Sequence, residues 1–308
     1  MAVFTPVSDD QARTFLQTYD LGQLQALTPI AEGVENTNYR LDTATGRFVL
    51  TLFEHRTRED ALPFCLGLTD HLARRGYPAP QPMADRAGAW IGRLNERPAS
   101  IIDWRTGDWL RAPDHADRNA AGRALAQLHL TAADYPGQRS DPMGTATCQS
   151  LVEACEGLAI GDDRRMLDRL QAELACAVGP ATPLPAGPIH ADYFPDNVLF
   201  DDGVVSGVID FYFACVDVLA YDLAIALNAW GFDAAGDVVP AAIDAFLAGY
   251  ESVRPLTSAE RAALPDQGAR AVVRFTLTRL HDRLQANPDA LVTTKDPVPF
   301  LRRLDYWR

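Results

Sequence analysis

The stretch His190-Ala191-Asp192-Tyr193-Phe194-Pro195-Asp196-Asn197 constrains this chain most, because it sets polar side chains at short spacing before two apolar runs. The runs Val198-Leu199-Phe200 and Val204 to Ile209 are separated by Asp201-Asp202-Gly203. An Asp-Asp-Gly between such runs predicts a β-hairpin, since glycine tolerates the positive φ that the turn needs. We expect this hairpin to bring Asp210 back beside Asn197.

Asp192 and Asn197 stand five residues apart, as the aspartate and asparagine of the kinase catalytic-loop pattern do. Moving a phosphoryl group needs positioning and charge neutralisation more than covalent chemistry. An aspartate takes or orients the proton of the acceptor hydroxyl, while an amide oxygen and a carboxylate hold Mg²⁺ against the phosphates. We therefore predict an ATP-dependent phosphotransferase with Asp192 as base and with Asn197 and Asp210 as metal ligands.

The alternative is that these residues only cap turns, as Asp and Asn often do. The agreement between the motif and the predicted hairpin favours the catalytic interpretation.

Length indicates about two domains or one large two-lobed unit, and 47% hydrophobic residues are enough for a sizeable core. The net charge of −13 argues against nucleic acid or an anionic membrane as partner. Neither a run of 18 apolar residues nor a signal-peptide pattern is present, so we expect a cytoplasmic protein.

The five cysteines form no CxxC pair, which favours buried thiols over a zinc site. The oligomeric state stays open.

The N-terminal part predicts a small antiparallel sheet with a helix. Residues 8–20 fit a short helix capped by Ser8, and residues 28–53 fit strands that meet in hairpins. The polar turn from Gly33 through Asn36 and Thr37 to Asn38 is predicted to lie over the phosphates, where backbone N–H groups approach closely. An ordinary hairpin turn is the alternative.

A helix from Arg58 to Arg75 and two strands at 89–94 and 99–104 complete this predicted lobe, residues 1–99. The segment 100–106 is the predicted hinge, in which backbone groups around Ile102 meet adenine.

From Asp114 onward the pattern becomes helical, and residues 107–308 are predicted to form a larger, mostly helical lobe, giving an α+β fold. His129 lies on an apolar helical stripe, which favours a hydrogen-bonded core histidine over a catalyst. The predicted helices are His115 to Thr131, one or two within 148–178, Asp217 to Trp230, and pieces at 238–250, 258–264, 268–286 and 297–307.

Several segments resemble one known superfamily. Leu125-Ala126-Gln127-Leu128-His129, the 190–197 stretch, Ile209-Asp210-Phe211 and Tyr221-Asp222-Leu223-Ala224 are similar to landmarks of the aminoglycoside-phosphotransferase-like and choline-kinase-like branch of the protein kinase fold. Within it the chain resembles the homoserine kinases in four stretches, 33–39, 48–54, 208–215 and 291–297. The resemblance implies a two-lobed fold and transfer of the ATP γ-phosphate to the hydroxyl of L-homoserine, giving O-phospho-L-homoserine, a precursor of threonine.

One position departs from the general kinase pattern. Thr51 stands on the strand Phe48 to Phe53 where the ATP-pairing lysine is expected, and the single lysine of the chain is Lys295. Either Mg²⁺ and backbone donors suffice for the phosphates, or an arginine such as Arg40 contributes.

An amino-acid acceptor needs groups for an ammonium, a carboxylate and a hydroxyl. The residues predicted to line its site are Tyr193, Tyr212, Asn228, Arg274 and Arg279, with Trp230 beside them. For the arginines a solvated ion-pair ladder is the alternative. Asp222 is expected to brace the catalytic loop.

Two further functions remain open on the sequence. One is a kinase for choline, ethanolamine or an aminoglycoside, and choline would call for an aromatic cage. The other is a nucleotide-binding pseudokinase, which the missing lysine supports and the complete set of Asp192, Asn197 and Asp210 opposes.

Overall fold

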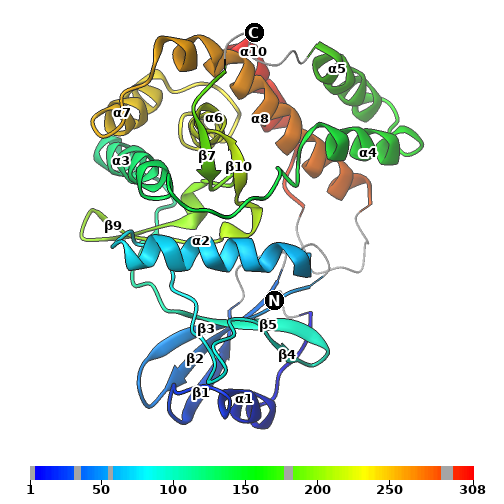
Figure 1. Ribbon diagram of the computed structural model, residues 1–308. Coiled ribbons are helices and arrows are strands. Elements are labelled where there is room, and N and C mark those ends of the chain that lie inside the picture. Colours follow the sequence, from blue (N-terminus) through cyan, green and yellow to red (C-terminus); the bar gives the residue numbers. More distant parts are fainter. Residues whose placement is uncertain (1–3, 31–35, 55–57, 177–182, 286–293) are drawn as a thin grey trace. The chain divides into compact units, whose positions relative to one another are not determined.

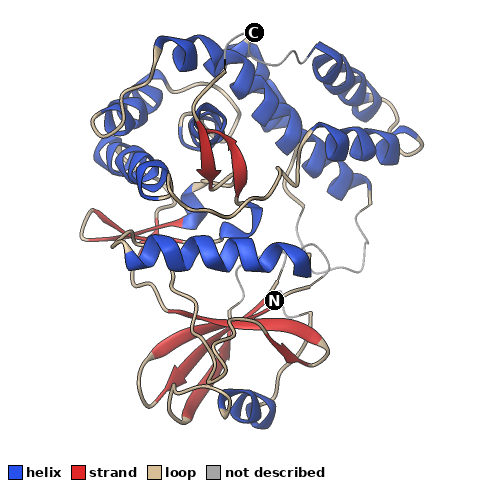
Figure 2. Cartoon of the chain, viewed as in Figure 1, coloured by secondary structure: helices blue, strands red, loops and turns tan. Residues whose placement is uncertain are grey.

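The structure, a computed structural model, describes residues 4–30, 36–54, 58–176, 183–285 and 294–308 (Figure 1). Its contacts divide it into two compact units. The first contains Met1–Thr106 and Gly207–Tyr212, and the second contains Gly107–Ser206 and Phe213–Arg308. The five-stranded sheet lies in the first unit and most helices lie in the second (Figure 2), which confirms the predicted α+β class.

The first unit is built on a five-stranded antiparallel sheet in the order β1-β2-β3-β5-β4. Alternate residues of β3 (Phe48, Leu50 and Leu52) are buried, as expected where one face of a sheet covers a core. The strands are β1 (Leu24–Pro29), β2 (Thr37–Thr43), β3 (Arg47–Leu52), β4 (Gly92–Leu94) and β5 (Arg97–Asp103).

Helix α1 (Asp9–Leu16) packs on that face, where its Phe15 and Leu16 join the core cluster of the sheet. It begins at Ser8, whose side chain and Gln11 form a capping box, so the predicted cap is confirmed. A 3₁₀ turn, η1 (Glu59–Ala61), leads into α2 (Leu62–Arg74). Leu62 and Leu66 of α2 form a second cluster with Phe53.

The second unit packs around α6 (Leu219–Trp230), in which every residue except Ala229 is buried. This hydrophobicity on all sides is typical of a central helix. The surrounding helices are α3 (His115–Thr131), α4 (Thr145–Glu156), α5 (Asp162–Cys176), α7 (Pro240–Glu251), α8 (Ser258–Leu284), α9 (Val298–Arg302) and α10 (Leu304–Trp307).

Two short sheets lie beside these helices. One has the order β6-β8-β9, from Asp108–Trp109, Val198–Asp201 and Val204–Val208, and so confirms the predicted hairpin. Its turn residues Asp202 and Gly203 both have positive φ, at 46° and 75°. The other sheet pairs β7 (Ala186–Ile189) with β10 (Cys215–Val218).

Some predicted boundaries were wrong. The sequence did not predict β6, β7 and β10, since segments of two to four residues are too short to show the alternation of hydrophobic residues that marks a strand. The helix predicted from Asp217 begins instead at Leu219, after β10. The two pieces predicted at 258–264 and 268–286 form one helix, α8, which continues through Pro265. The buried residues that follow Pro265 in α8 stabilise the helix enough to offset the hydrogen bond that proline cannot make.

Helices α3 and α7 approach each other at two glycines. A Cβ on Gly122 would lie 2.1 Å from the Phe246 carbonyl oxygen, and one on Gly249 would lie 2.0 Å from the Asn119 carbonyl oxygen. We expect Gly122→Ala to lower the free energy of unfolding by about 1–3 kcal/mol, because the two backbones must move apart. Urea denaturation measures the change.

Gly157→Ala is the matched control, since a Cβ there meets nothing within 4 Å. Its φ of −81° suits alanine, so the variant should be neutral or slightly more stable. Equal stabilities of the two variants would contradict the close approach at Gly122.

Candidate active site

The loop between β7 and β8 carries the predicted catalytic residues and is held by a buried carboxylate. Asp222 of α6 accepts hydrogen bonds from the backbone N–H of His190 (2.9 Å) and of Ala191 (2.8 Å). Ala191 has a φ of 61°, a left-handed conformation that is strained for a residue with a Cβ. Asp222 therefore stabilises a backbone turn that would otherwise be unfavourable.

Asp222 is itself the last member of a buried series of hydrogen-bonded side chains. His129 Nε2 lies 3.0 Å from Asp222 Oδ2, and His129 Nδ1 lies 2.7 Å from the Tyr250 hydroxyl. Arg254 donates to that hydroxyl and also to the fully buried Glu260. The His129 ring thus bridges the Tyr250 hydroxyl and the Asp222 carboxylate, and each of its two nitrogens has a hydrogen-bond partner.

Burial by itself raises the pKa of Asp222, but the hydrogen bond and charge of His129 and the backbone donor of His190 outweigh it. The pKa of this carboxyl is therefore lowered, and Asp222 is ionised at neutral pH. His129 is thus a hydrogen-bonded core residue, as the sequence predicted.

Asp192 and Asn197 lie side by side in this loop. Asn197 Nδ2 donates to the backbone oxygen of Asp192 at 2.8 Å and to its carboxylate Oδ2 at 3.1 Å. The 3₁₀ turn η2 (Pro195–Asn197) makes this geometry possible, with the Asn197 N–H bonded to the Phe194 carbonyl oxygen. Because Nδ2 is used within the loop, Oδ1 is the atom of this amide that suits a hard cation. Metal binding by Asn197 stays a prediction.

Arg274 of α8 holds the other side of the same turn. Its Nη1 donates to the Ala191 carbonyl oxygen at 2.8 Å, and its guanidinium lies 4.6 Å from the Phe275 ring centroid. Only 2% of Arg274 is exposed. The residue before Asp192 is thus fixed by Asp222 through its N–H and by Arg274 through its carbonyl group.

Asp210 belongs to the first unit, two residues beyond β9. It also has a positive φ, 64°. Burial, followed by the charge of Asp210, raises the pKa of the Tyr212 hydroxyl well above its usual range. Tyr212 packs edge-on against Phe53, with ring centroids 5.1 Å apart.

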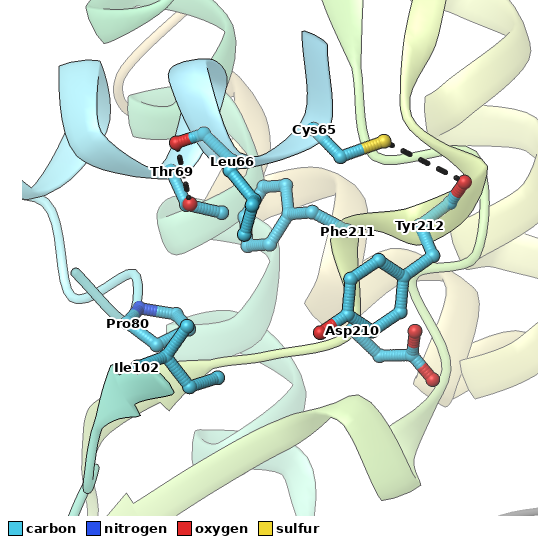
Figure 3. Close-up of a pocket in the computed structure, with 8 residues that line it drawn as sticks. All are labelled: Cys65, Leu66, Thr69, Pro80, Ile102, Asp210, Phe211 and Tyr212. Carbon is cyan, nitrogen blue, oxygen red and sulfur yellow. Dashed lines mark hydrogen bonds between the residues drawn. The ribbon is translucent and has the colours of Figure 1, made fainter. Parts of the chain in front are cut away.

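A small pocket of the first unit has Asp210 in its wall (Figure 3). Cys65 Sγ donates to the Tyr212 carbonyl oxygen on one side of it. The predicted adenine neighbour Ile102 lies in β5 and lines the same pocket. The full set of lining residues is Cys65, Leu66, Thr69, Pro80, Ile102, Asp210, Phe211 and Tyr212.

The residues predicted to contact the nucleotide lie where β2 begins and β3 ends. Thr51 is paired with Asn38 across the strands, and its hydroxyl donates to Asn38 Oδ1 at 2.8 Å. Thr37 Oγ1 donates to the buried Glu54, and Asn36 Oδ1 accepts from the Glu54 N–H. Gly33, the remaining residue of the predicted phosphate loop, lies outside the described residues.

Two residues predicted for the acceptor are fully buried and use their polar groups inside the protein. Tyr193 donates to the Ala121 carbonyl oxygen at 3.0 Å. Asn228 donates to the carbonyl oxygens of Ala224 and Gly268, and its Oδ1 accepts from Trp307. Trp230 donates to the Tyr193 carbonyl oxygen. Their contact with an acceptor stays a prediction.

Arg279, also predicted for the acceptor, lies on α8 with its guanidinium 4.4 Å from the Phe300 ring centroid. Arg303 contacts the same ring at 4.1 Å, and the sequence analysis did not single it out. Arg303 lies three residues after Phe300, a spacing that surface arginines share and that therefore gave no distinguishing signal.

Within the described ranges no three His, Cys, Asp or Glu side chains gather as a metal site would require. The proposed donors are instead an amide and a carboxylate, a set that suits Mg²⁺ carried by substrate phosphates. The part of the chain that the structure describes contains no helix long and apolar enough to cross a membrane.

Comparison with known proteins decides the family. Residues 26–256 match the model of the phosphotransferase enzyme family. The homoserine kinase of Gluconacetobacter diazotrophicus is 48% identical, over 100% of this chain and 97% of its own. The homoserine kinase of Xanthobacter autotrophicus is 46% identical, over 99% of this chain and 96% of its own. The chain belongs to the homoserine kinases of this phosphotransferase family. The resemblance in the sequence is confirmed.

Solved structures of this superfamily share the fold at much lower identity. An amicoumacin kinase, solved with AMP-PNP and Ca²⁺, has a TM-score of 0.70 at 16% identity and covers 97% of this chain and 92% of its own. A microcompartment-associated aminopropanol kinase has a TM-score of 0.70 at 18% identity, and the match covers 97% of this chain and 94% of its own. These similarities confirm the protein-kinase-like fold.

Proposed function

We propose that this protein transfers the γ-phosphate of Mg²⁺-bound ATP to the side-chain hydroxyl of L-homoserine, giving O-phospho-L-homoserine. The observation that carries the proposal is the hydrogen-bonded pair of Asp192 and Asn197 on an anchored loop, in a chain nearly half identical to homoserine kinases. The product would enter threonine biosynthesis. A cytoplasmic location stays a prediction.

In the proposed mechanism, Asp192 accepts a hydrogen bond from the acceptor hydroxyl and takes its proton as the phosphoryl group is transferred. Its carboxylate is oriented by Asn197 Nδ2. Asn197 Oδ1 and the Asp210 carboxylate are the proposed ligands of Mg²⁺. When bound, the ion neutralises the charge that develops on the phosphates.

For the nucleotide we propose the residues predicted from the sequence: Gly33, Asn36, Thr37, Asn38, Thr51 and Ile102. Thr51 stands where kinases usually have a lysine, and it is neutral. Backbone donors and Mg²⁺ therefore neutralise more of the negative charge of the phosphates. The corresponding division is a nucleotide-binding lobe at 1–99, a hinge at 100–106 and a catalytic lobe at 107–308.

For the acceptor we keep the predicted set, namely Tyr193, Tyr212, Asn228, Arg274 and Arg279, as a proposal. The hydrogen bond from Arg274 to the Ala191 carbonyl oxygen supports a positioning role for this residue, with the turn before Asp192 as its target. Among the residues that the structure describes Arg279 makes no such backbone bond, and it is the stronger candidate for direct contact.

We expect ADP release to be fastest with L-homoserine when the protein is given MgATP and, separately, homoserine, choline, ethanolamine and an aminoglycoside. A coupled pyruvate kinase and lactate dehydrogenase assay measures it, and omission of divalent cation should abolish it. Turnover of choline or an aminoglycoside without turnover of homoserine would show that the acceptor is wrong. No turnover with any acceptor would favour a nucleotide-binding module without activity.

A further inference from the structure

Three aromatic rings connect the catalytic loop to the C-terminal helices of the second unit. Phe194, two residues after Asp192, lies 4.9 Å from Phe275 of α8 and 6.3 Å from Phe300 of α9, measured between ring centroids. Phe275 and Phe300 are 5.4 Å apart. This aromatic cluster therefore places α8 and α9 next to the loop that carries the proposed base.

Two guanidinium groups lie against the Phe300 ring of this cluster. The Cζ atoms of Arg279 and Arg303 are 4.4 and 4.1 Å from its centroid. Phe300 itself is fully buried, and Arg303 is only 9% exposed. Two positive charges thus lie against one ring of the cluster.

Within the described part of the chain these two arginines have no carboxylate partner, although most other arginines do. Ion pairs with carboxylates within 4.0 Å are common among the arginines of the described ranges, for example Arg254 with Glu260 and Arg270 with Asp217. Across the same ranges no carboxylate lies within 4.0 Å of Arg279 or Arg303. Arg303 donates from Nη1 to the Asn228 carbonyl oxygen, while its buried Nε meets no acceptor among those residues.

Burying guanidinium groups without a neighbouring anion is energetically unfavourable. Burial, followed by the charge of Arg279, lowers the pKa of Arg303 to about 10. Burial likewise lowers the pKa of Arg279, although the carboxylates of Asp192, Asp196 and Asp296 act in the opposite direction. A buried cation with an unused N–H is stabilised when a carboxylate or phosphate oxygen takes that position.

We infer that Arg279 and Arg303 form the binding site for the α-carboxylate of an amino-acid acceptor. This inference rests on the proposed function, because homoserine carries a carboxylate at the end opposite its reacting hydroxyl. Phe194, two residues after Asp192, packs against the Phe300 ring on which both guanidinium groups lie, so the arginines belong to the surroundings of the loop that carries the proposed base. The arginines would thereby select amino acids over amino alcohols.

The test compares two acceptors in the wild type and in Arg279→Gln. The acceptors are L-homoserine and 3-aminopropan-1-ol, which has the same amine and hydroxyl but no carboxylate. We expect the variant to lose about 10- to 100-fold in kcat/KM for homoserine, the effect of one charge-assisted hydrogen bond. The kcat/KM for 3-aminopropan-1-ol and the KM for ATP should stay within about twofold of the wild type, as expected if only the carboxylate contact is lost.

Two further variants serve as controls. Arg279→Lys keeps the charge but not the planar fork, and should recover part of the loss. Arg261→Gln removes an arginine of the same helix that is paired with Glu251, and should leave both acceptors unaffected. Thermal melting of each variant shows whether it is folded.

Three kinds of result would contradict the proposed carboxylate site. Equal losses for the two acceptors, or no loss for either, would overturn the carboxylate site while leaving the kinase activity intact. A raised KM for ATP with an unchanged KM for homoserine would assign these arginines to phosphate and would also overturn it. Absence of homoserine turnover in the wild type would overturn the proposed function first, and this inference with it.

Discussion

Asp192→Ala is expected to lower kcat for homoserine by about 10²- to 10⁴-fold, the range for loss of a general base. The hydrogen bond from Asn197 shows that this carboxylate is held in one orientation, so its removal should affect turnover more than binding. Steady-state kinetics with saturating MgATP measure kcat, and nucleotide binding should persist.

Asp201→Ala provides the control, because this exposed aspartate lies at the turn of the hairpin that follows the catalytic loop. Its kcat should match that of the wild type. If Asp192→Ala retained normal turnover, the base would have to be another residue, and the proposed mechanism would fail at its central step.

The second large effect concerns stability. We expect Asp222→Ala to lower the free energy of unfolding by about 3–5 kcal/mol, the cost of removing one partner from a buried ionic network. The substitution leaves the N–H groups of His190 and Ala191 without their acceptor and also removes the partner of His129. Urea denaturation at pH 7 measures the loss.

The same carboxylate predicts a pH dependence. Because folding lowers the pKa of Asp222, its stabilisation is fully present above its unfolded pKa, about 4, and is lost as pH falls through the lower folded value. The difference in unfolding free energy between wild type and Asp222→Ala should therefore be largest near neutral pH and shrink in acid. A difference that grew as the pH fell would contradict an ionised Asp222.

Asp222 also shows how one residue joins fold and site. It lies on the central helix α6, where an isolated carboxylate would be unfavourable, yet three donors converge on it. A variant that stays folded should lose activity as well as stability, because the turn before Asp192 loses its anchor. The expectation from the sequence, that Asp222 braces the loop, agrees with these contacts.

The sequence by itself determined the features that depend on neighbouring residues. The Ser8 cap, the helix from His115 to Thr131 and the hairpin around Asp202 and Gly203 all follow from local backbone preferences. The spacing of Asp192 and Asn197 likewise lies within one loop, and the structure shows them hydrogen bonded. The family was also recognisable from short stretches of sequence.

Only the tertiary structure decided what depends on contacts between distant residues. The pairing of β7 with β10 joins Ile189 to Cys215, and α8 continues through Pro265 because its C-terminal half packs in the core. The position of Arg303 against Phe300, beside Arg279 from another helix, had no local signal that distinguished it from a surface arginine. Burial and charge environment arise from packing, and a linear pattern does not contain them.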